Sequence, residues 1–248
     1  MVKFKLTTLK LSFLKLPDSF NQIKIVHLSD LHSKYFGPAE KKVLKILNQI
    51  KPDYIFVTGD WIDIHTKNLS SIRKFWKSLA EICLTYGVLG NHEHKNKNFK
   101  ISDINLALYN SGIKILNNQN QRLTKDNKSI YLIGVDDPHL GYDNLSKAYP
   151  PENGFKILLA HSPEIINKIK DKSIDLILCG HTHGGQIRIP PIPSIWIPTK
   201  ISKKYDQGLF KLNHSYLYIN SGIGTSLLPI RFLCPPEITV LELNSIRN

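Results

Sequence analysis

The sequence predicts an α/β (α+β) fold in which two mixed β-sheets pack face to face between helices, a four-layer αββα sandwich. Short apolar runs alternate with amphipathic stretches in the first two thirds of the chain, and Pro-rich loops and further strands follow. No linker or repeat interrupts this order, and 248 residues suffice for one large hydrophobic core. We therefore expect a single domain over residues 1–248.

Buried strands are predicted where short runs of β-branched and other apolar residues occur, at residues 23–28, 54–58, 86–89, 130–135, 155–160 and 174–179. Between the early runs, apolar residues spaced for one helix face predict helices around residues 43–50 and 72–79. Strand and helix thus alternate, as in βαβ units.

The pattern changes after Cys179. A Pro-rich loop follows, and then apolar runs at residues 209–212, 216–220 and 238–243. We expect these late strands to pair in antiparallel fashion and to complete the second sheet as hairpins.

Polar clusters follow five of the predicted strands. They are Asp30-Leu31-His32, Gly59-Asp60, Gly90-Asn91-His92-Glu93, His161 and Gly180-His181-Thr182-His183. Loops at the carboxyl ends of strands in an α/β sheet form a crevice, so these side chains are expected to converge there. The glycines permit sharp turns and close backbone approach beside the ligand-type residues.

This ordered set resembles the signature of the calcineurin-like metallophosphoesterase superfamily, over residues 30–183. The resemblance implies the metallophosphoesterase fold and a site for two divalent metal ions. It assigns one metal to Asp30, His32 and His183, the other to Asn91, His161 and His181, and makes Asp60 the bridge. Nitrogen and oxygen ligands together suit Mn, Fe, Co or Zn, and we expect manganese to support activity best.

The same resemblance implies a mechanism for cleaving a phosphodiester or pyrophosphate bond. Two ions neutralise the anionic substrate and acidify a bridging water that attacks phosphorus in line. His92 would protonate the leaving oxygen, and Asp63 would orient His92; an exposed loop carboxylate is the alternative reading of Asp63. Ile64 stands where the protein Ser/Thr phosphatases of the superfamily carry an Arg, which argues against that branch.

Later stretches resemble one subgroup, the bacterial YkuE/YaeI-type phosphodiesterases, which include a UDP-2,3-diacylglucosamine pyrophosphatase of lipid A synthesis. These stretches begin at His181, Ser202, Gly222, Leu228 and Cys234. Within or beside them lie candidate substrate contacts that are equally compatible with solvated or structural roles: Gln186, Arg188, Lys203, Lys204 and Arg231.

Charge and an apolar loop suggest a lipid-linked substrate. The formal net charge of +13 favours anionic phosphate-containing partners, although lysines also simply maintain solubility. Ile195, Trp196 and Ile197 would form a lid or a foot on an anionic membrane; a core role for Trp196 is the alternative. The pattern indicates neither a signal peptide nor a disulfide framework, so a cytoplasmic protein, peripheral on the inner face of the membrane, is expected.

Three other functions share some of these sequence features. The metallo-β-lactamase fold also uses His-x-His, but continues it with Asp-His, whereas Gly184 and Gly185 follow His183 here. A nuclease or cyclic-nucleotide phosphodiesterase of the same superfamily stays open, although no tract interleaves basic and aromatic residues, and nucleic acid is not expected. A non-catalytic binding scaffold is the third, and retention of every ligand and of His92 argues against it. The sequence does not indicate an oligomeric state.

Overall fold

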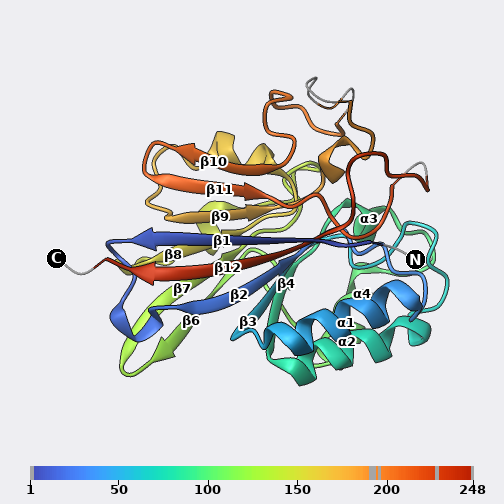
Figure 1. Ribbon diagram of the computed structural model, residues 1–248, viewed down its shortest axis with the longest axis horizontal. Helices are drawn as coiled ribbons and strands as arrows, with labels where there is room; N and C mark the ends of the chain where they lie inside the picture. The colour runs from blue at the N-terminus through green and yellow to red at the C-terminus, as the bar shows by residue number, and fades with distance from the viewer. Residues whose placement is uncertain (1–2, 190–193, 195–196, 227–228, 247–248) are drawn as a thin grey trace.

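The computed structural model describes residues 3–189, 194, 197–226 and 229–246, and contains two six-stranded sheets (Figure 1). The first sheet has the order β1 (Lys5–Phe13), β12 (Glu237–Ser245), β2 (Ile23–Leu28), β3 (Tyr54–Thr58), β4 (Leu84–Val88) and β5 (Lys114–Ile115). The second has the order β10 (Gly208–Leu212), β11 (Ser215–Ile219), β9 (Leu176–Cys179), β8 (Lys156–Leu159), β7 (Lys128–Gly134) and β6 (Gln119–Lys125).

Helices cover the outer faces of the two sheets unequally. The first sheet is covered by α1 (Pro38–Ile50), α2 (Ser70–Ile82) and α4 (Ile101–Tyr109), whereas the described part of the chain places the short α5 (Leu145–Ala148) and the 3-10 helix η2 (Pro163–Lys168) against the second. No helix among the described residues is long and apolar enough to cross a membrane.

Three apolar clusters correspond to the three interfaces between the four layers. Leu11, Phe56, Leu132 and Leu178 belong to the cluster between the sheets. A second cluster joins the first sheet to α1 and α2, and a third joins the second sheet to α5 and η2. The predicted sandwich is therefore confirmed.

Both sheets are mixed, as predicted. β2, β3, β4 and β5 are parallel, while β12 returns antiparallel to β2. In the second sheet β7, β8 and β9 are parallel, and β10 and β6 pair antiparallel with their neighbours. The expectation of a wholly antiparallel late half was wrong. β11 runs parallel to β9, because β10 runs in the opposite direction and the β10–β11 hairpin reverses the chain again. The last late strand, β12, does not complete the second sheet but lies in the first, between β1 and β2.

The predicted strands and the two predicted helices are otherwise present, but the strands β1, β5 and β6 and the helix α4 were not predicted. β1 alternates Lys and Thr with apolar residues, which is the period of a half-exposed strand. β6 is mostly polar because it lies at the edge of its sheet and is largely exposed, so no apolar run marks it in the sequence. A two-residue turn joins β6 to β7, and its residues Asp126 and Asn127 have positive φ.

Candidate metal centre

The five polar clusters lie at the carboxyl ends of β2, β3, β4, β8 and β9, where the two sheets meet. Five of their residues have left-handed backbones, with φ between 45° and 69°: Asp30, His32, Asp60, His181 and His183. Such conformations cost about 1–3 kcal/mol each and persist where surrounding structure holds them. Strain therefore concentrates where the predicted ligands lie.

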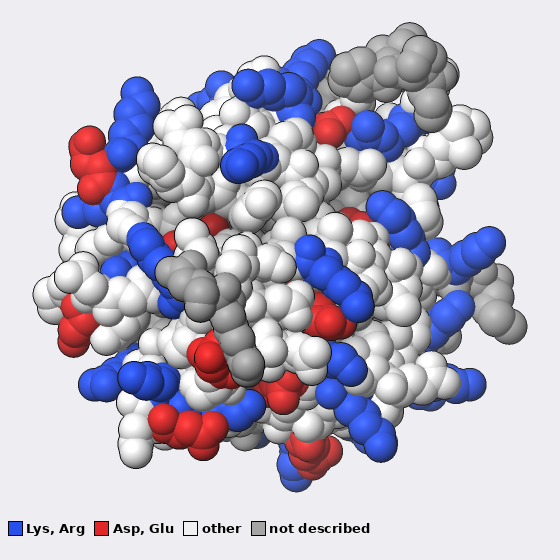
Figure 2. Space-filling view, turned by 60° about the vertical axis from the view of Figure 1, so that its left-hand side comes forward, with Lys and Arg blue, Asp and Glu red and all other residues white. Residues whose placement is uncertain are grey.

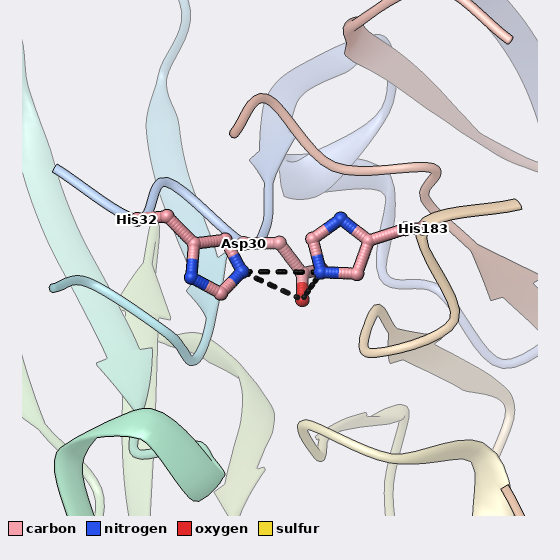
Figure 3. A group of neighbouring side chains, drawn as sticks. All are labelled: Asp30, His32 and His183. Carbon is pink, nitrogen blue, oxygen red and sulfur yellow. Dashed lines mark hydrogen bonds and ion pairs between the residues drawn. The ribbon is translucent and has the colours of Figure 1, made fainter. Parts of the chain in front are cut away.

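Asp30, His32 and His183 form the first group of converging side chains (Figure 3). His32 Nε2 lies 3.1 Å from His183 Nε2, and Asp30 Oδ1 lies 3.4 Å from His183 Nε2 and 3.9 Å from His32 Nε2. Burial lowers the pKa of His183 to about 4 and that of His32 well below its ordinary value, although nearby carboxylates oppose both shifts. Neutral imidazoles are the form that binds a cation.

Asn91, His161 and His181 form the second group. His161 Nε2 lies 3.1 Å from both Asn91 Oδ1 and His181 Nδ1. Burial lowers the pKa of His181 well below its ordinary value. The same burial acts on His161, but Asp60 overcomes it and raises the pKa of His161 well above its ordinary value.

Asp60 lies between the two groups. Its Oδ2 is 3.5 Å from His32 Nε2 in the first group and 3.5 Å from His161 Nε2 in the second. Burial alone would raise the pKa of Asp60, but His161 and His92 hold it well below its ordinary value. One carboxylate thus faces both groups in its ionised form.

Hydrogen bonds to the outer ring nitrogens favour tautomers whose inner nitrogens carry a lone pair. His161 Nδ1 is 2.8 Å from the Thr58 carbonyl, and His181 Nε2 is 2.5 Å from the Pro198 carbonyl. Each outer nitrogen therefore donates a proton outward, as is usual for metal-binding histidines. The donor set fits divalent cations that accept nitrogen and oxygen ligands.

Glu93 holds two of the clusters together, a role that was not predicted for it. Its carboxylate accepts the backbone N–H groups of Asp60, Ile62 and Gly90. Burial, with Asp60 nearby, raises the pKa of Glu93 to about 8. The signal in the sequence is Gly90-x-x-Glu93, a capping box that begins α3 (Asn91–Lys95).

His92 faces the centre between the two groups, with Nε2 3.9 Å from Asp60 Oδ2. Its Nδ1 accepts the backbone N–H of Ile64 at 3.0 Å and lies 3.1 Å from His32 Nδ1. Because His92 Nδ1 accepts the Ile64 N–H, the proton of the neutral His92 ring lies on Nε2.

Asp63 lies beside His92 but has other hydrogen-bond partners. Its Oδ1 accepts the backbone N–H of His65 at 2.8 Å and lies 3.6 Å from Lys34 Nζ. The hydrogen bond to His92 Nδ1 that the resemblance implies for this carboxylate is instead made by the neighbouring Ile64 backbone. Asp63 therefore acts on His92 indirectly, because its hydrogen bond to His65 stabilises the loop that carries Ile64.

The two predicted arginine contacts are engaged within the protein. Arg188 forms an ion pair with Asp206 at 2.6 Å, and Arg231 donates to the carbonyls of Ser221, Gly224 and Cys234. Arg231 thereby fixes the loop that packs against the first group. Gln186 likewise exchanges two hydrogen bonds with the backbone of Ser226.

Lys203 and Lys204 are exposed, and Lys204 Nζ lies 4.7 Å from the Tyr205 ring. A cavity of about 680 Å³ opens at the second group, and its described lining includes Asn91, His92 and His181 but none of the four predicted cations. The cations that line it are Lys34 and Lys95. Sequence reasoning missed both, although Lys95 lies one turn after Asn91 in α3 and Lys34 two residues after His32.

The predicted apolar lid or foot lies largely outside the described residues, as do Ile195 and Trp196. Ile197 is described and is buried, so it contributes to the interior. On the face shown in Figure 2, Lys and Arg side chains are spread among uncharged residues and form no continuous stripe, so no nucleic-acid track is indicated there.

A four-layer sandwich with two groups of histidines, a carboxylate between them and a cavity beside them defines a metal-dependent phosphoesterase. The chain belongs to the calcineurin-like phosphoesterase family, whose model matches residues 23–185. The predicted resemblance is thus confirmed.

Two curated relatives align over most of the chain. The metallophosphoesterase YkuE of Bacillus subtilis is 34% identical, over 93% of this chain and 82% of its own. The phosphodiesterase YaeI of Escherichia coli is 33% identical, over 97% of this chain and 88% of its own. A solved structure, TT1561 of Thermus thermophilus, has a TM-score of 0.53 at 14% identity, covering 82% of this chain and 90% of its own, and this likeness concerns the fold alone.

Proposed function

We propose that this protein hydrolyses a phosphodiester or pyrophosphate bond with two divalent metal ions, manganese being the first to test. Asp30, His32 and His183 would hold one ion and Asn91, His161 and His181 the other, with Asp60 shared. The observation that carries the proposal is the position of Asp60 Oδ2, 3.5 Å from an inner nitrogen of each group. The similarity to phosphodiesterase YaeI supports a diester over a monoester.

Two bound ions would neutralise the substrate phosphate and supply a nucleophile at neutral pH. The residues of the chain have complementary tasks. His92 Nε2 faces the centre, so His92 in its imidazolium form would donate the Nε2 proton to the leaving oxygen and be left as a neutral ring. The Ile64 backbone N–H, 3.0 Å from His92 Nδ1, helps to orient the ring in this way.

Lys34 and Lys95 are better placed than the predicted cations to attract the substrate, because both line the cavity at the metal centre. Lys34 is paired with Asp63 at 3.6 Å, whereas Lys95 forms no ion pair among the described residues. An ammonium group at the cavity wall suits a phosphate oxygen.

Hydrolysis of bis-p-nitrophenyl phosphate tests the proposed reaction. We expect turnover that requires added Mn²⁺ and is abolished by chelation. A panel of UDP-diacylglucosamine, cyclic nucleotides, glycerophosphodiesters and simple monoesters then ranks substrates. A preference for monoesters, or turnover that survives chelation, would contradict the proposal.

An exposed apolar patch beside the cavity supports a lipid-linked substrate, of the UDP-2,3-diacylglucosamine type, and peripheral contact with an anionic membrane. The patch comprises four side chains that are 49% to 62% exposed: Ile189, Ile230, Phe232 and Leu233. Its two segments are joined by a bridge between Ile187 and Phe232, and the adjacent Pro229 lines the cavity. Apolar side chains on a protein of net charge +13 suit an anionic lipid surface.

Sedimentation with phosphatidylglycerol vesicles tests this contact. Phe232→Ser with Leu233→Ser should reduce binding by about 10²-fold or more, since each buried apolar side chain contributes about 1.5–3 kcal/mol. Leu106→Ser is the matched control, because Leu106 is 58% exposed on α4, outside the patch. Equal loss in the control, or no binding by the wild type, would contradict membrane contact.

A further inference from the structure

A carboxylate outside the two ligand groups gathers three segments of the chain beside the second group. Glu164 Oε1 lies 3.0 Å from His139 Nδ1, and accepts the Thr199 hydroxyl at 3.2 Å and the Lys200 backbone N–H at 3.0 Å. Glu164 belongs to η2, His139 to the loop after β7, and Thr199 and Lys200 to the loop before β10. One oxygen thus joins η2 to two loops that are distant from it in sequence.

The two loops that Glu164 contacts both lead directly to His181. Pro198, which immediately precedes Thr199, supplies the carbonyl that accepts from His181 Nε2 at 2.5 Å. The His139 ring lies against the His181 ring, with centroids 4.6 Å apart. His181 is therefore held at its outer nitrogen and on one ring face by groups that Glu164 positions.

We propose that Glu164 is a positioning residue for the second metal site, acting with His139 and the Pro198–Lys200 segment as a latch on His181. This inference rests on the proposed function, because it takes His181 as a metal ligand. The latch keeps the proton of His181 on Nε2, so that Nδ1 presents its lone pair toward His161 and Asn91. Hydrogen-bond partners of ligand histidines commonly fix tautomer and ring orientation in this way.

The latch acts on one ion only. Glu164 has contacts with the surroundings of His181 and none, among the described residues, with Asp30, His32 or His183. The first group is held instead by the loop that Arg231 fixes. Loss of the latch should therefore weaken the second ion selectively.

The same latch shapes the cavity. His139 and Pro198 both line it, at the side where His181 is exposed to it. If Glu164 no longer holds them, substrate affinity should fall together with the affinity for the second ion. Both effects would be indirect, through the positions of His139 and Pro198, because Glu164 is not among the described residues that line the cavity.

Titration of the metal-free full chain with Mn²⁺ tests the proposal. Calorimetry measures the Kd of each ion, and electron paramagnetic resonance detects the signal of a coupled pair of Mn²⁺ ions. Glu164→Ala should raise the Kd of one ion by about 10- to 100-fold and abolish the coupled-pair signal, while leaving the other Kd within about threefold. Glu164→Gln keeps a carbonyl at Oε1 and should restore most of the affinity. Glu152→Ala, which changes an exposed glutamate, is the matched control.

The outcomes separate the latch from the function on which it rests. A wild type that binds fewer than two ions contradicts the proposed function itself. A wild type that binds two ions, with Glu164→Ala binding both as tightly or losing both equally, contradicts the latch alone. Should Glu164→Ala fail to fold, Thr199→Val removes one hydrogen bond of the latch and should weaken the same single ion; an unchanged Kd there would also overturn the latch.

Discussion

The two ligand groups on either side of Asp60 are supported in different ways. Backbone atoms pack closely against the first group, which forms one half of the centre. Gly222 contacts Asp30, Gly224 contacts His32, and the Gly224 N–H donates to the Asp30 carbonyl. In the second group, Gly59 and Gly90 pack in the same way against His161, but Asn91 and His181 face the cavity. His181 is held by the Pro198 carbonyl and the His139 ring, so loops and not tight backbone packing position the ligand that faces the cavity.

Asp60 contacts both groups, so its replacement should weaken the binding of both ions. We expect Asp60→Asn to lower kcat/KM on bis-p-nitrophenyl phosphate by about 10³-fold or more, because the metal ions supply several kcal/mol of transition-state stabilisation. Bound Mn²⁺, measured by elemental analysis after gel filtration, should fall below two per chain. Asp126→Asn, in the turn between β6 and β7, is the control. Two tightly bound ions in Asp60→Asn would refute the shared position.

His92 faces both halves, and its removal should spare the metals. His92→Ala should lower kcat on an alkyl diester such as glycerophosphocholine by about 10²- to 10³-fold, because general-acid catalysis contributes that much. The loss on bis-p-nitrophenyl phosphate should be much smaller, since p-nitrophenolate leaves without a proton. Equal losses of kcat on the two substrates, or loss of a bound ion, would contradict the role of His92 as a general acid.

Gly222 tests whether packing fixes the first half. Its φ is +76°, and a Cβ there would lie 2.7 Å from Asp30 Cβ, whereas Gly141 has a φ of +79° and open space around it. Gly222→Ala and Gly141→Ala share the backbone strain of about 1–2 kcal/mol, and only the former adds overlap. We expect Gly222→Ala to unfold at lower urea and to bind the first ion about 10- to 100-fold more weakly. Similar behaviour of the two variants would refute this dependence on packing.

His27 gives a smaller effect, on stability alone, in the core between the sheets. Burial lowers its pKa to about 3, although Glu237 opposes the shift, and Nε2 is hydrogen-bonded to Thr58. The folded state thus binds fewer protons than the unfolded state between pH 6.5 and about 3, so stability falls as pH falls through that window.

The contribution of His27 approaches about 1.4 kcal/mol per pH unit. Urea unfolding of the metal-free protein at several pH values measures it, and His27→Asn should flatten the slope by that amount. An unchanged slope would show that His27 does not titrate on unfolding.

The strands that carry the ligands of the first half, and the four-layer arrangement around them, were predictable from the sequence. These ligands come directly after buried strands. The apolar runs, and the polar residues that end them, therefore predict that the ligands lie close together. Convergence of Asp60, His161 and His181 follows from the same rule. Their assignment to individual ions came from the family resemblance and remains a proposal.

The surroundings of the second half could not be predicted. Lys34, Lys95, His139 and Glu164 acquire their positions from contacts between loops that are distant in sequence. Arg188 and Arg231 looked like substrate contacts because charge alone does not reveal an internal carbonyl or carboxylate partner. β1 was missed because exposed lysines alternate with its apolar residues.

Anomalous diffraction from crystals of the Mn²⁺-loaded protein tests the central claim most directly. We predict two peaks, one among Asp30, His32 and His183 and one among Asn91, His161 and His181, with Asp60 Oδ2 between them. A single peak, or a second ion away from Asp60, would contradict the proposed two-metal centre.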